Sequence, residues 1–402
     1  MRLFSSPAIA TQPDMTEPIP LQNATELLDR LVSFDTTSAK SNLELIAFVQ
    51  DYLARLGVQS EIVPYQDGAK ANLFATIGAE SGPGIILSGH TDVVPARAEE
   101  WESDPFTLTR RGSRLYGRGT ADMKGFVAVV LASIPAFLAK SCSRPIHIAL
   151  SCDEEVGCGG VKPMIAHITR TYPLPLAVVV GEPTLMQVVN ATKGVATYVT
   201  ELTGQEAHSS DPRRGVNAIA FAGHALLELE RLAERLKAKG DPTGCFDPPY
   251  ATLNVGVIAG GTVKNVVPCH CSITWEIRFP AGIDLAEPLA QMEKFGSNLE
   301  ARMQAVSPDC RVSTRELRCV GALAPDNGSY AESLVLGALR GNRVVSASYA
   351  TEAGLFQAAG MPTVICGPGS IDQAHKPNEF IEIGELEACA TFVHRLVDTL
   401  SA

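Results

Sequence analysis

The chain has 402 residues, with 33 lysines and arginines against 44 aspartates and glutamates, so its formal net charge is −11 at pH 7. A chain of this length can bury a large core, and it favours two domains over one. The acidic balance argues against a nucleic-acid partner, because binding to a phosphate backbone needs an excess of positive charge.

The ten cysteines are scattered through the sequence. In a long chain this usage favours reduced, mostly buried thiols and therefore the cytoplasm. Residues 1–14 hold two prolines and one short apolar patch. That patch is too short for a signal peptide or a membrane span, so we expect a loose N-terminal arm and no membrane partner. Cys269 and Cys271 are expected to pack on one face of a strand and not to bind metal.

The first part of the chain predicts alternating helices and strands. Helices are expected at 23–32, capped by Asn23, and at 42–56. Continuous apolar runs predict strands that are buried on both faces, and they lie at 85–87, 146–150, 176–180 and 364–365. The apolar segment 125–140 has the length of a helix between two of these strands. This alternation predicts an α/β domain with a mixed, mainly parallel sheet flanked by helices.

The pattern changes between residues 194 and 312, where it predicts a small inserted domain. The expected order is strand, helix, strand, strand, helix, at 195–202, 215–239, 251–258, 269–279 and 285–305. This order is typical of an α+β, ferredoxin-like sandwich. We therefore expect a first catalytic part at 1–193, an inserted domain at 194–312, and a second catalytic part at 313–402 with helical segments at 332–339, 351–359 and 384–400.

Five residues with metal-binding side chains follow the predicted strands or a glycine-rich turn, and they are His90, Asp122, Glu155, Glu182 and His375. The carboxyl edge of an open sheet is where α/β folds place their sites. Imidazole and carboxylate donors suit zinc and tolerate other divalent first-row ions. Taken singly, Asp122 could be a helix cap and His375 a surface residue. The ordered set predicts a hydrolytic site with two metals, bridged by Asp122.

Two further acids accompany these ligands. Asp92 lies two residues after His90, where its carboxylate could orient the imidazole without binding metal. Glu154 and Glu155 are adjacent, so their side chains point in different directions and cannot share one task. One is expected to bind metal while the other transfers a proton, and the repulsion between them favours a nearby cation over a solvated acidic loop.

From about residue 21 onward, these motifs resemble the family of di-zinc amidohydrolases and metallopeptidases that contains acetylornithine deacetylase, succinyl-diaminopimelate desuccinylase, aminoacylase and glutamate carboxypeptidase. The resemblance implies two Zn²⁺ ions, for which Co²⁺ can substitute. It implies that one metal is held by His90 and Glu182, the other by Glu155 and His375, and that Glu154 is the base. It also implies that the inserted domain is a lid through which two chains form a homodimer.

The resemblance implies roles in the lid as well. The segment Gly204 to Ser210 is similar to a family motif whose histidine, here His208, stabilises the oxyanion, often from the partner subunit. The segment 260–268 with Asn265, together with Arg278, is similar to the family's contacts with the substrate carboxylate. Without the family, Asn265 would be a turn residue and Arg278 a surface charge.

The segments 349–356 and 366–377 are most similar to those of the acetylornithine deacetylases. This implies hydrolysis of N-acetyl-L-ornithine to L-ornithine and acetate in arginine biosynthesis. We expect Glu352 to pair with the side-chain ammonium of the substrate and Arg278 with its α-carboxylate. The alternatives are a broader N-acyl-amino-acid hydrolase, a desuccinylase or a dipeptidase. A silent member that acts as a binding protein is a further alternative, which the complete ligand set argues against.

Overall fold

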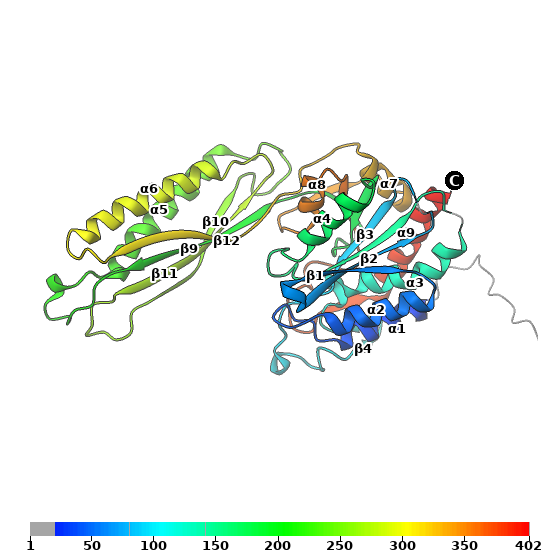
Figure 1. The fold of residues 1–402 in the computed structure, drawn as a ribbon, viewed down its shortest axis with the longest axis horizontal. Coiled ribbons are helices and arrows are strands. Elements are labelled where there is room, and N and C mark those ends of the chain that lie inside the picture. The colour runs from blue at the N-terminus through cyan, green and yellow to red at the C-terminus, as the bar shows by residue number, and fades with distance from the viewer. Residues whose placement is uncertain (1–20, 80, 141, 402) are drawn as a thin grey trace, which may run out of the picture.

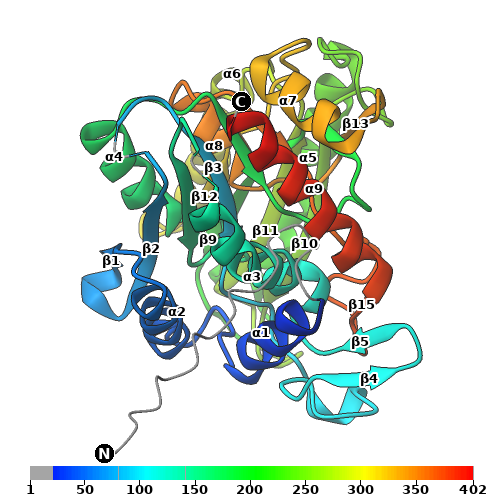
Figure 2. The ribbon, with the colours of Figure 1, turned by 90° about the vertical axis from the view of Figure 1, so that its right-hand side faces the viewer.

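The computed structural model describes residues 21–401 except 80 and 141, so the predicted arm at 1–14 lies outside the described residues. The chain forms two domains, which keep the names of their predicted roles: a catalytic domain and an elongated lid that projects from it (Figure 1). Viewed along the long axis, the lid lies behind the catalytic domain (Figure 2).

The catalytic domain is built on an eight-stranded sheet in the order β1-β2-β6-β3-β7-β14-β8-β13. The four neighbours β6, β3, β7 and β14 are parallel, while β1, β2 and the β14–β8 pair are antiparallel. The mixed, mainly parallel sheet is therefore confirmed. Its strands are β1 (Ser60–Tyr65), β2 (Lys70–Ile77), β3 (Ile85–His90), β6 (Ile146–Ser151), β7 (Ala177–Val180), β8 (Val188–Thr192), β13 (Val344–Ala347) and β14 (Thr363–Ile365).

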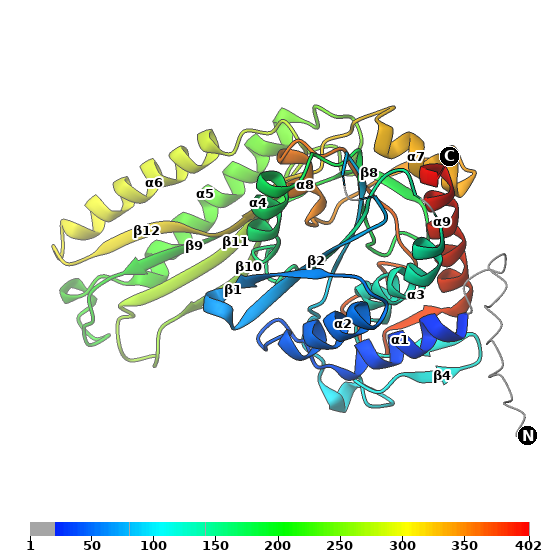
Figure 3. The ribbon, with the colours of Figure 1, turned by 45° about the vertical axis from the view of Figure 1, so that its right-hand side comes forward.

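Helices cover both faces of this sheet, as Figure 3 shows. In β3, Ile85 and Leu87 belong to one apolar cluster and Ile86 belongs to another, which follows from the period of two in a strand. The cluster with Ile85 and Leu87 includes residues of α1 (Leu21–Ser33), α2 (Leu43–Arg55), α3 (Gly125–Ala139), α7 (Tyr330–Leu339) and α9 (Ile383–Ser401). The cluster with Ile86 includes residues of α4 (Val161–Thr171) and α8 (Ala353–Ala358).

Among the described residues, one helical segment, Thr120–Ala139, is long and apolar enough to cross a membrane by length and composition. In the apolar stretch, 83% of the residues are buried inside the protein. Its second part, α3, packs in the same core as α1 and α9. The apolar character of this segment is therefore that of a core helix.

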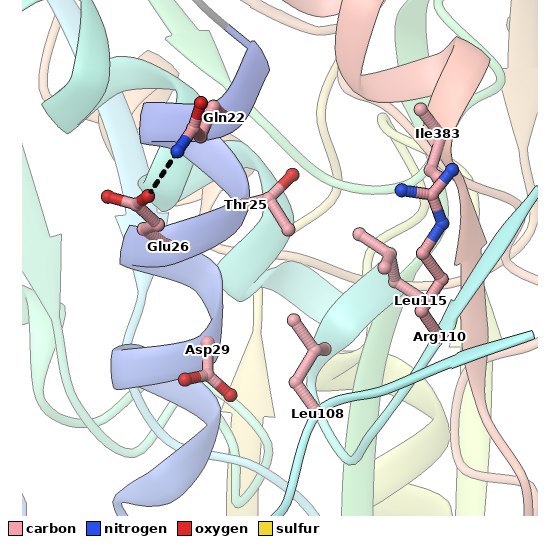
Figure 4. Close-up of a pocket in the computed structure, with 8 residues that line it drawn as sticks. All are labelled: Gln22, Thr25, Glu26, Asp29, Leu108, Arg110, Leu115 and Ile383. Carbon is pink, nitrogen blue, oxygen red and sulfur yellow. Dashed lines mark hydrogen bonds between the residues drawn. The ribbon is translucent and has the colours of Figure 1, made fainter.

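A small three-stranded sheet lies at the edge of the catalytic domain, in the order β15-β5-β4. Its strands are β4 (Thr109–Arg111), β5 (Arg114–Tyr116) and β15 (Phe380–Glu382). A cavity of about 570 Å³ opens beside it (Figure 4), lined by Gln22, Thr25, Glu26, Asp29, Leu108, Arg110, Leu115 and Ile383. None of the predicted site residues lines this cavity.

The lid is an α+β sandwich with the ferredoxin-like order βαββαβ. It contains β9 (Gly194–Thr203), α5 (Ala218–Lys239), β10 (Thr252–Gly260), β11 (His270–Phe279), α6 (Ala286–Gln304) and β12 (Arg311–Val320). The strands pair antiparallel in the order β10-β11-β9-β12. Its core surrounds the stacked rings of Tyr198 and Trp275, whose centroids are 4.5 Å apart.

Two boundaries differ from the sequence prediction. The lid does not end at residue 312, because β12 continues its pairing with β9 as far as Val320. The charged residues of β12 and its bulge between Glu316 and Arg318 hide the alternation that marks a strand. At the other end of the chain, α1 already begins at Leu21, so Asn23 lies inside the helix and does not cap it.

Shorter elements complete the fold. Single helical turns occur at Gln66–Gly68, Ala98–Glu100, Thr120–Lys124 and Pro212–Arg214. Among the described residues no two cysteines form a disulfide, and most of the thiols are buried, as the sequence predicts.

Candidate metal centre

The predicted ligands converge because their strands are neighbours. His90 ends β3, Glu155 follows β6, Glu182 follows β7, and His375 lies beyond β14. These four parallel strands are adjacent in the sheet, so their carboxyl ends lie at one edge. Candidate ligand atoms of His90, Asp122 and Glu155 lie within 4.8 Å of one another, and so do those of His90, Glu154 and Glu182.

His90 is buried, and both of its ring nitrogens are engaged. Nδ1 lies 2.8 Å from the backbone carbonyl of Asp92, so Nδ1 carries the proton and donates it to that oxygen. Nε2 faces Asp122 Oδ1 at 3.0 Å and Glu182 Oε1 at 3.9 Å. Because Nδ1 is the donor to this carbonyl, Nε2 is the ring nitrogen that faces the centre, and it can bind a metal once it has lost its proton.

The interaction between Asp92 and His90 differs from the prediction. The Asp92 carboxylate lies 3.8 Å from His90 Nδ1, and the backbone carbonyl of Asp92 accepts the hydrogen bond instead. The carboxylate accepts hydrogen bonds from Ser38 Oγ at 2.7 Å and from the backbone N–H groups of Glu154 and Glu155 at 3.1 and 3.3 Å. The side chain of Asp92 therefore holds the loop that carries both glutamates.

Asp122 spans the centre with its two carboxylate oxygens. Oδ1 faces His90 Nε2 at 3.0 Å, and Oδ2 faces His375 Nε2 at 3.4 Å. Burial by itself raises the pKa of Asp122, but hydrogen bonds from His375 and His90 hold it below its ordinary value. One carboxylate thus faces two imidazoles, which is the arrangement expected of a bridging ligand.

Glu154 and Glu155 lie in the loop after β6 and point to different partners. Glu155 Oε2 is 2.9 Å from His375 Nε2. Glu154 Oε1 accepts a hydrogen bond from the thiol of Cys158 at 3.3 Å. Burial raises the pKa of Glu154 to about 8, with a further contribution from the charge of Glu155, so this carboxyl can exchange a proton near neutral pH.

The surroundings of the Glu182 carboxylate indicate whether a cation fits the centre. It is 4% exposed, and its Oε1 atom is buried without a hydrogen-bond partner. Burial and the neighbouring charge of Asp122 raise its pKa well above the ordinary value. A buried carboxylate oxygen without a donor is costly, and a divalent cation would satisfy it. The donor set of imidazoles and carboxylates fits such ions.

His375 is the most accessible member of the set, with 55% of its side chain exposed. Its backbone φ of 64° lies in the left-handed region. Hydrogen bonds to Asp122 and Glu155 raise the pKa of His375 to about 10. The structure thus brings all five predicted ligands and Glu154 together at one edge of the sheet.

The predicted lid residues divide between its two ends. His208 and Asn265 lie beyond the ends of β9 and β10, where the backbone N–H of Ser209 donates to the carbonyl of Asn265 at 3.1 Å. Arg278 lies at the base of the lid, opposite Val195, and its Nε is 3.0 Å from Glu276 Oε1. Within the part of the chain that the structure describes, no hydrogen bond or ion pair joins these three residues to the five ligands.

The prediction for Glu352 is wrong in this structure. Glu352 is 0% exposed, and its two oxygens accept hydrogen bonds from Ser88 Oγ and Ser151 Oγ, each at 2.6 Å. A substrate ammonium cannot reach a carboxylate that is fully buried and already bonded at both oxygens.

Sequence reasoning also missed Glu379, which is 1% exposed. Its carboxylate accepts hydrogen bonds from the backbone N–H groups of Gly119, Ala121 and Asp122 at 2.9, 2.9 and 3.1 Å. Arg118 Nη1 donates to the same carboxylate at 2.7 Å. Glu379 therefore fixes the turn that presents Asp122, although no local sequence pattern distinguishes it from a surface acid.

The sequence matches peptidase family M20/M25/M40 over residues 86–399. The chain therefore belongs to peptidase family M20/M25/M40. It is 35% identical over 389 residues to an acetylornithine deacetylase of Proteus mirabilis (strain HI4320), covering 94% of this chain and 97% of that protein. It is 36% identical over 371 residues to an acetylornithine deacetylase of Yersinia pseudotuberculosis, covering 90% and 92%.

Solved structures share the fold at low sequence identity. The M20 family metallo-carboxypeptidase Sso-CP2 from Sulfolobus solfataricus matches with a TM-score of 0.74 and 19% identity, covering 94% of this chain and 99% of that chain. Human carnosine dipeptidase 1 matches with a TM-score of 0.71 and 17% identity, covering 95% and 97%. A Bacillus subtilis protein described as a dinuclear metal binding peptidase from the M20 family matches with a TM-score of 0.62 and 16% identity, covering 94% and 98%.

Proposed function

We propose that this protein is a metal-dependent amidohydrolase that converts N-acetyl-L-ornithine to L-ornithine and acetate in arginine biosynthesis. The observation that carries the proposal is the convergence of five imidazole and carboxylate ligands beside a sixth acid, Glu154. The names of the relatives from Proteus mirabilis and Yersinia pseudotuberculosis support acetylornithine as the substrate.

The proposed centre holds two divalent cations, two Zn²⁺ ions for which Co²⁺ can substitute. Asp122 would bridge them, His90 and Glu182 would hold one, and Glu155 and His375 would hold the other. The two-sided contacts of Asp122 support this division, and so does the unsatisfied Oε1 of Glu182. The description of the related Bacillus subtilis protein as dinuclear supports a pair of ions.

Bound divalent cations would lower the pKa of a water molecule and polarise the amide carbonyl. The residues of the chain supply the rest of the chemistry. Glu154 takes the proton from the attacking water and returns it to the leaving amine, a task for which its raised pKa suits it. Asp92 keeps Glu154 in position through the backbone of the loop. His208 donates a hydrogen bond to the developing oxyanion.

The hydrogen bonds of His208 support its role as a donor. Its Nδ1 accepts from the backbone N–H of Ser210 at 3.2 Å and lies 2.7 Å from Ser210 Oγ. Because Nδ1 accepts, the proton resides on Nε2, which is then available to an oxyanion. The imidazole of His208 is exposed, as a group that meets a substrate must be.

We infer that His208 acts in the partner subunit of a homodimer. The strand β9 has 10 residues and runs from the base of the lid toward its tip, a length of about 33 Å at the rise of an extended strand. His208 follows Thr203, the last residue of this strand, in the chain. A side chain that far from its own catalytic domain is better positioned to reach a second chain. Asn265 would act in the partner subunit together with His208. Arg278, at the base of the lid, would contact the substrate carboxylate bound in its own chain.

The edge strand β10 is the proposed contact between the two lids. It lies at the end of the lid sheet and contains no charged residue. Val257 and Ile258 of β10 are 58% and 50% exposed, and Ile219 and Leu227 of the adjacent α5 are 42% and 52% exposed. An uncharged edge with exposed apolar side chains is suited to pairing with another strand. Pairing of two β10 strands would join both lids into one sheet.

The remaining expectations follow from the same features. The proposed substrate is a small N-acyl amino acid, and the acidic chain is not expected to bind nucleic acid. Buried thiols without disulfides among the described cysteines are compatible with a reducing compartment, so we propose a cytoplasmic location.

The deciding experiment is turnover by metal-stripped protein to which zinc or cobalt is restored. Four substrates would be compared side by side: acetylornithine, acetylmethionine, succinyl-diaminopimelate and a dipeptide. We expect activity only after metal is restored, with acetylornithine turned over at the highest kcat/KM. Preference for another substrate would select one of the alternative hydrolases. No turnover of any of the four substrates would contradict the proposal.

A further inference from the structure

Glu352 occupies a position that the proposed reaction does not use. It precedes α8 and is fully buried. Its Oε1 accepts from Ser88 Oγ and its Oε2 from Ser151 Oγ, each at 2.6 Å. Ser88 lies in β3, two residues before His90. Ser151 is the last residue of β6, three residues before Glu154.

The register of the sheet shows what this carboxylate joins. In the parallel pair of β3 and β6, Ser88 is opposite Ala149 and His90 is opposite Ser151. Residues opposite each other, and residues two apart, share one face of a sheet. Ser88, Ser151 and His90 therefore lie on the same face, and Glu352 bridges the two serines diagonally across the ends of both strands.

Backbone pairing between the two strands ends at His90 and Ser151. Beyond the last paired residues, the N–H of Thr91 donates to the carbonyl of Ser151 at 2.9 Å, and the chains then diverge into separate loops. One loop carries Asp92 and the other carries Glu154 and Glu155, and the Asp92 carboxylate joins the loops beyond the strand ends. A side chain that ties Ser88 to Ser151 would keep the two loops at a fixed separation.

Burying a carboxylate at this point is costly unless its oxygens are bonded. No lysine, arginine or histidine lies within ion-pair distance of Glu352 among residues 21–401 without 80 and 141, and the two serines are its hydrogen-bond partners there. A glutamate in this apolar layer, beside Ala353 and Phe356, is not explained by packing. Its two hydroxyl contacts are the feature that distinguishes it.

We propose that Glu352 is a positioning residue that clamps the ends of β3 and β6 through Ser88 and Ser151. The clamp fixes His90 on one strand relative to Glu154 and Glu155 after the other, and the inference rests on the proposed function of this centre. Among the described residues Glu352 makes no hydrogen bond or ion pair with the five ligands, and it acts through the two hydroxyl groups.

The test compares Glu352→Ala with Glu352→Gln and with the pair Ser88→Ala and Ser151→Ala. Alanine removes both contacts, whereas glutamine offers an amide to which the serine hydroxyls can donate or from which they can accept. Zinc and cobalt affinity are measured by calorimetric titration of the metal-stripped protein, without substrate. We expect Glu352→Ala to weaken metal binding and lower kcat by about ten- to a hundredfold, as for other residues that support ligands, and Glu352→Gln to restore most of the loss.

A mutant cycle separates the clamp from a general loss of stability. The double serine variant should reproduce the effect of Glu352→Ala, and adding Glu352→Ala to it should change little further, because all three residues act through the same contacts. Glu332→Ala is the matched control. Glu332 is also a buried glutamate, which accepts from Asn190 Nδ2 at 2.6 Å and from the N–H of Gly328 at 3.0 Å, and its replacement should leave metal affinity unchanged.

Two results would overturn the clamp. One is unchanged metal affinity and kcat in Glu352→Ala and in the double serine variant. The other is a higher KM of Glu352→Gln for acetylornithine with an unchanged KM for acetylmethionine. That result would mean that Glu352 contacts the substrate ammonium directly. Failure of the proposed function would look different, because wild-type protein would then hydrolyse none of the substrates while the metal titrations would still report on the clamp.

Discussion

The centre of the catalytic domain and the tip of the lid are built in opposite ways. At the centre, mostly buried side chains that follow four adjacent strands meet within one chain, and hydrogen bonds hold His90 and the loop of Glu154 and Glu155 in place. At the tip, His208 and Asn265 are exposed and lie on loops beyond the strand ends. The centre is preorganised by the fold of a single chain, whereas the proposed role of the tip requires a second surface.

This difference teaches where each step of the proposed reaction can fail. Changes at the centre should alter metal binding or proton transfer in any assembly state. Changes at the tip should act only through the partner subunit. The following predictions are arranged from the largest expected effect to the smallest.

Glu154→Gln should abolish turnover almost completely. Loss of a general base costs about a hundred- to ten-thousandfold in kcat. Because Glu154 is not one of the five proposed ligands, zinc affinity should stay close to that of the wild type. Steady-state kinetics together with metal titration check both statements. Turnover near the wild-type rate would remove Glu154 from its proposed role.

His208→Ala should lower kcat by about a hundred- to a thousandfold, the usual loss for one oxyanion donor. Mixing this variant with Glu154→Gln distinguishes the partner from the same chain. If His208 serves the other subunit, a mixed dimer contains one site with both groups intact. Random exchange should then restore about a quarter of the wild-type activity, since half of the dimers are mixed and half of their sites are complete.

The control for this experiment is each variant exchanged with itself, which should stay inactive. An inactive mixture, with mixed dimers confirmed by mass spectrometry, would mean that His208 and Glu154 of one chain act together.

Glu379→Gln should have an intermediate effect, confined to the centre. It weakens the hydrogen bonds to the N–H groups of Ala121 and Asp122 and leaves Arg118 buried without a charged partner. Support residues of this kind typically contribute about ten- to a hundredfold in metal affinity or activity. Calorimetric titration should show weaker zinc binding with an unchanged dimer. Unaltered zinc affinity would mean that the turn holds its shape without Glu379.

The smallest expected effect is on the pH dependence of folding stability, and it should be confined to the catalytic domain. Burial lowers the pKa of His147 to about 4, whereas an unfolded histidine has a pKa near 6.5. Between these values the unfolded chain binds a proton that the folded chain does not, so stability falls as the pH drops from about 6.5 toward about 4. His147→Gln should reduce the loss between pH 7 and pH 5 by about 2 kcal/mol.

The two tryptophans allow this effect to be located. Trp101 lies in the catalytic domain and Trp275 in the lid core, and the chain has no other tryptophan. In metal-free protein, Trp275→Phe leaves Trp101 as the reporter and Trp101→Phe leaves Trp275. His147→Gln should shift the urea transition that Trp101 reports and leave the transition of Trp275 in place. Equal shifts would mean that the two regions unfold as one unit.

The sequence was sufficient for the parts of the centre that depend on strand order. Apolar runs predict β3, β6 and β7, and residues after parallel neighbours must meet at one sheet edge, so His90, Glu155 and Glu182 could be grouped. The contacts that hold them are different. Glu352 and Ser88 are 264 residues apart in the chain. No local pattern indicates that this acid, unlike those near it in sequence, is buried.

The same limit applies to Asp92 and to the end of the lid. A spacing of two residues cannot distinguish the carboxylate of Asp92 from its backbone carbonyl as the partner of His90. The strand β12 escapes detection because its edge position allows charged residues and a bulge, which remove the periodicity of a half-buried strand.

The two edges of the lid sheet are chemically unlike. The strand β10 is free of charge, whereas β12 carries Arg311, Arg315, Glu316 and Arg318. If both edges were open, lids could add end to end without limit and form a filament. In the proposed dimer one edge would accept a second copy and the other would repel further strands, so association would stop at a closed pair. The arginine-rich strand would thereby act as a terminator of growth.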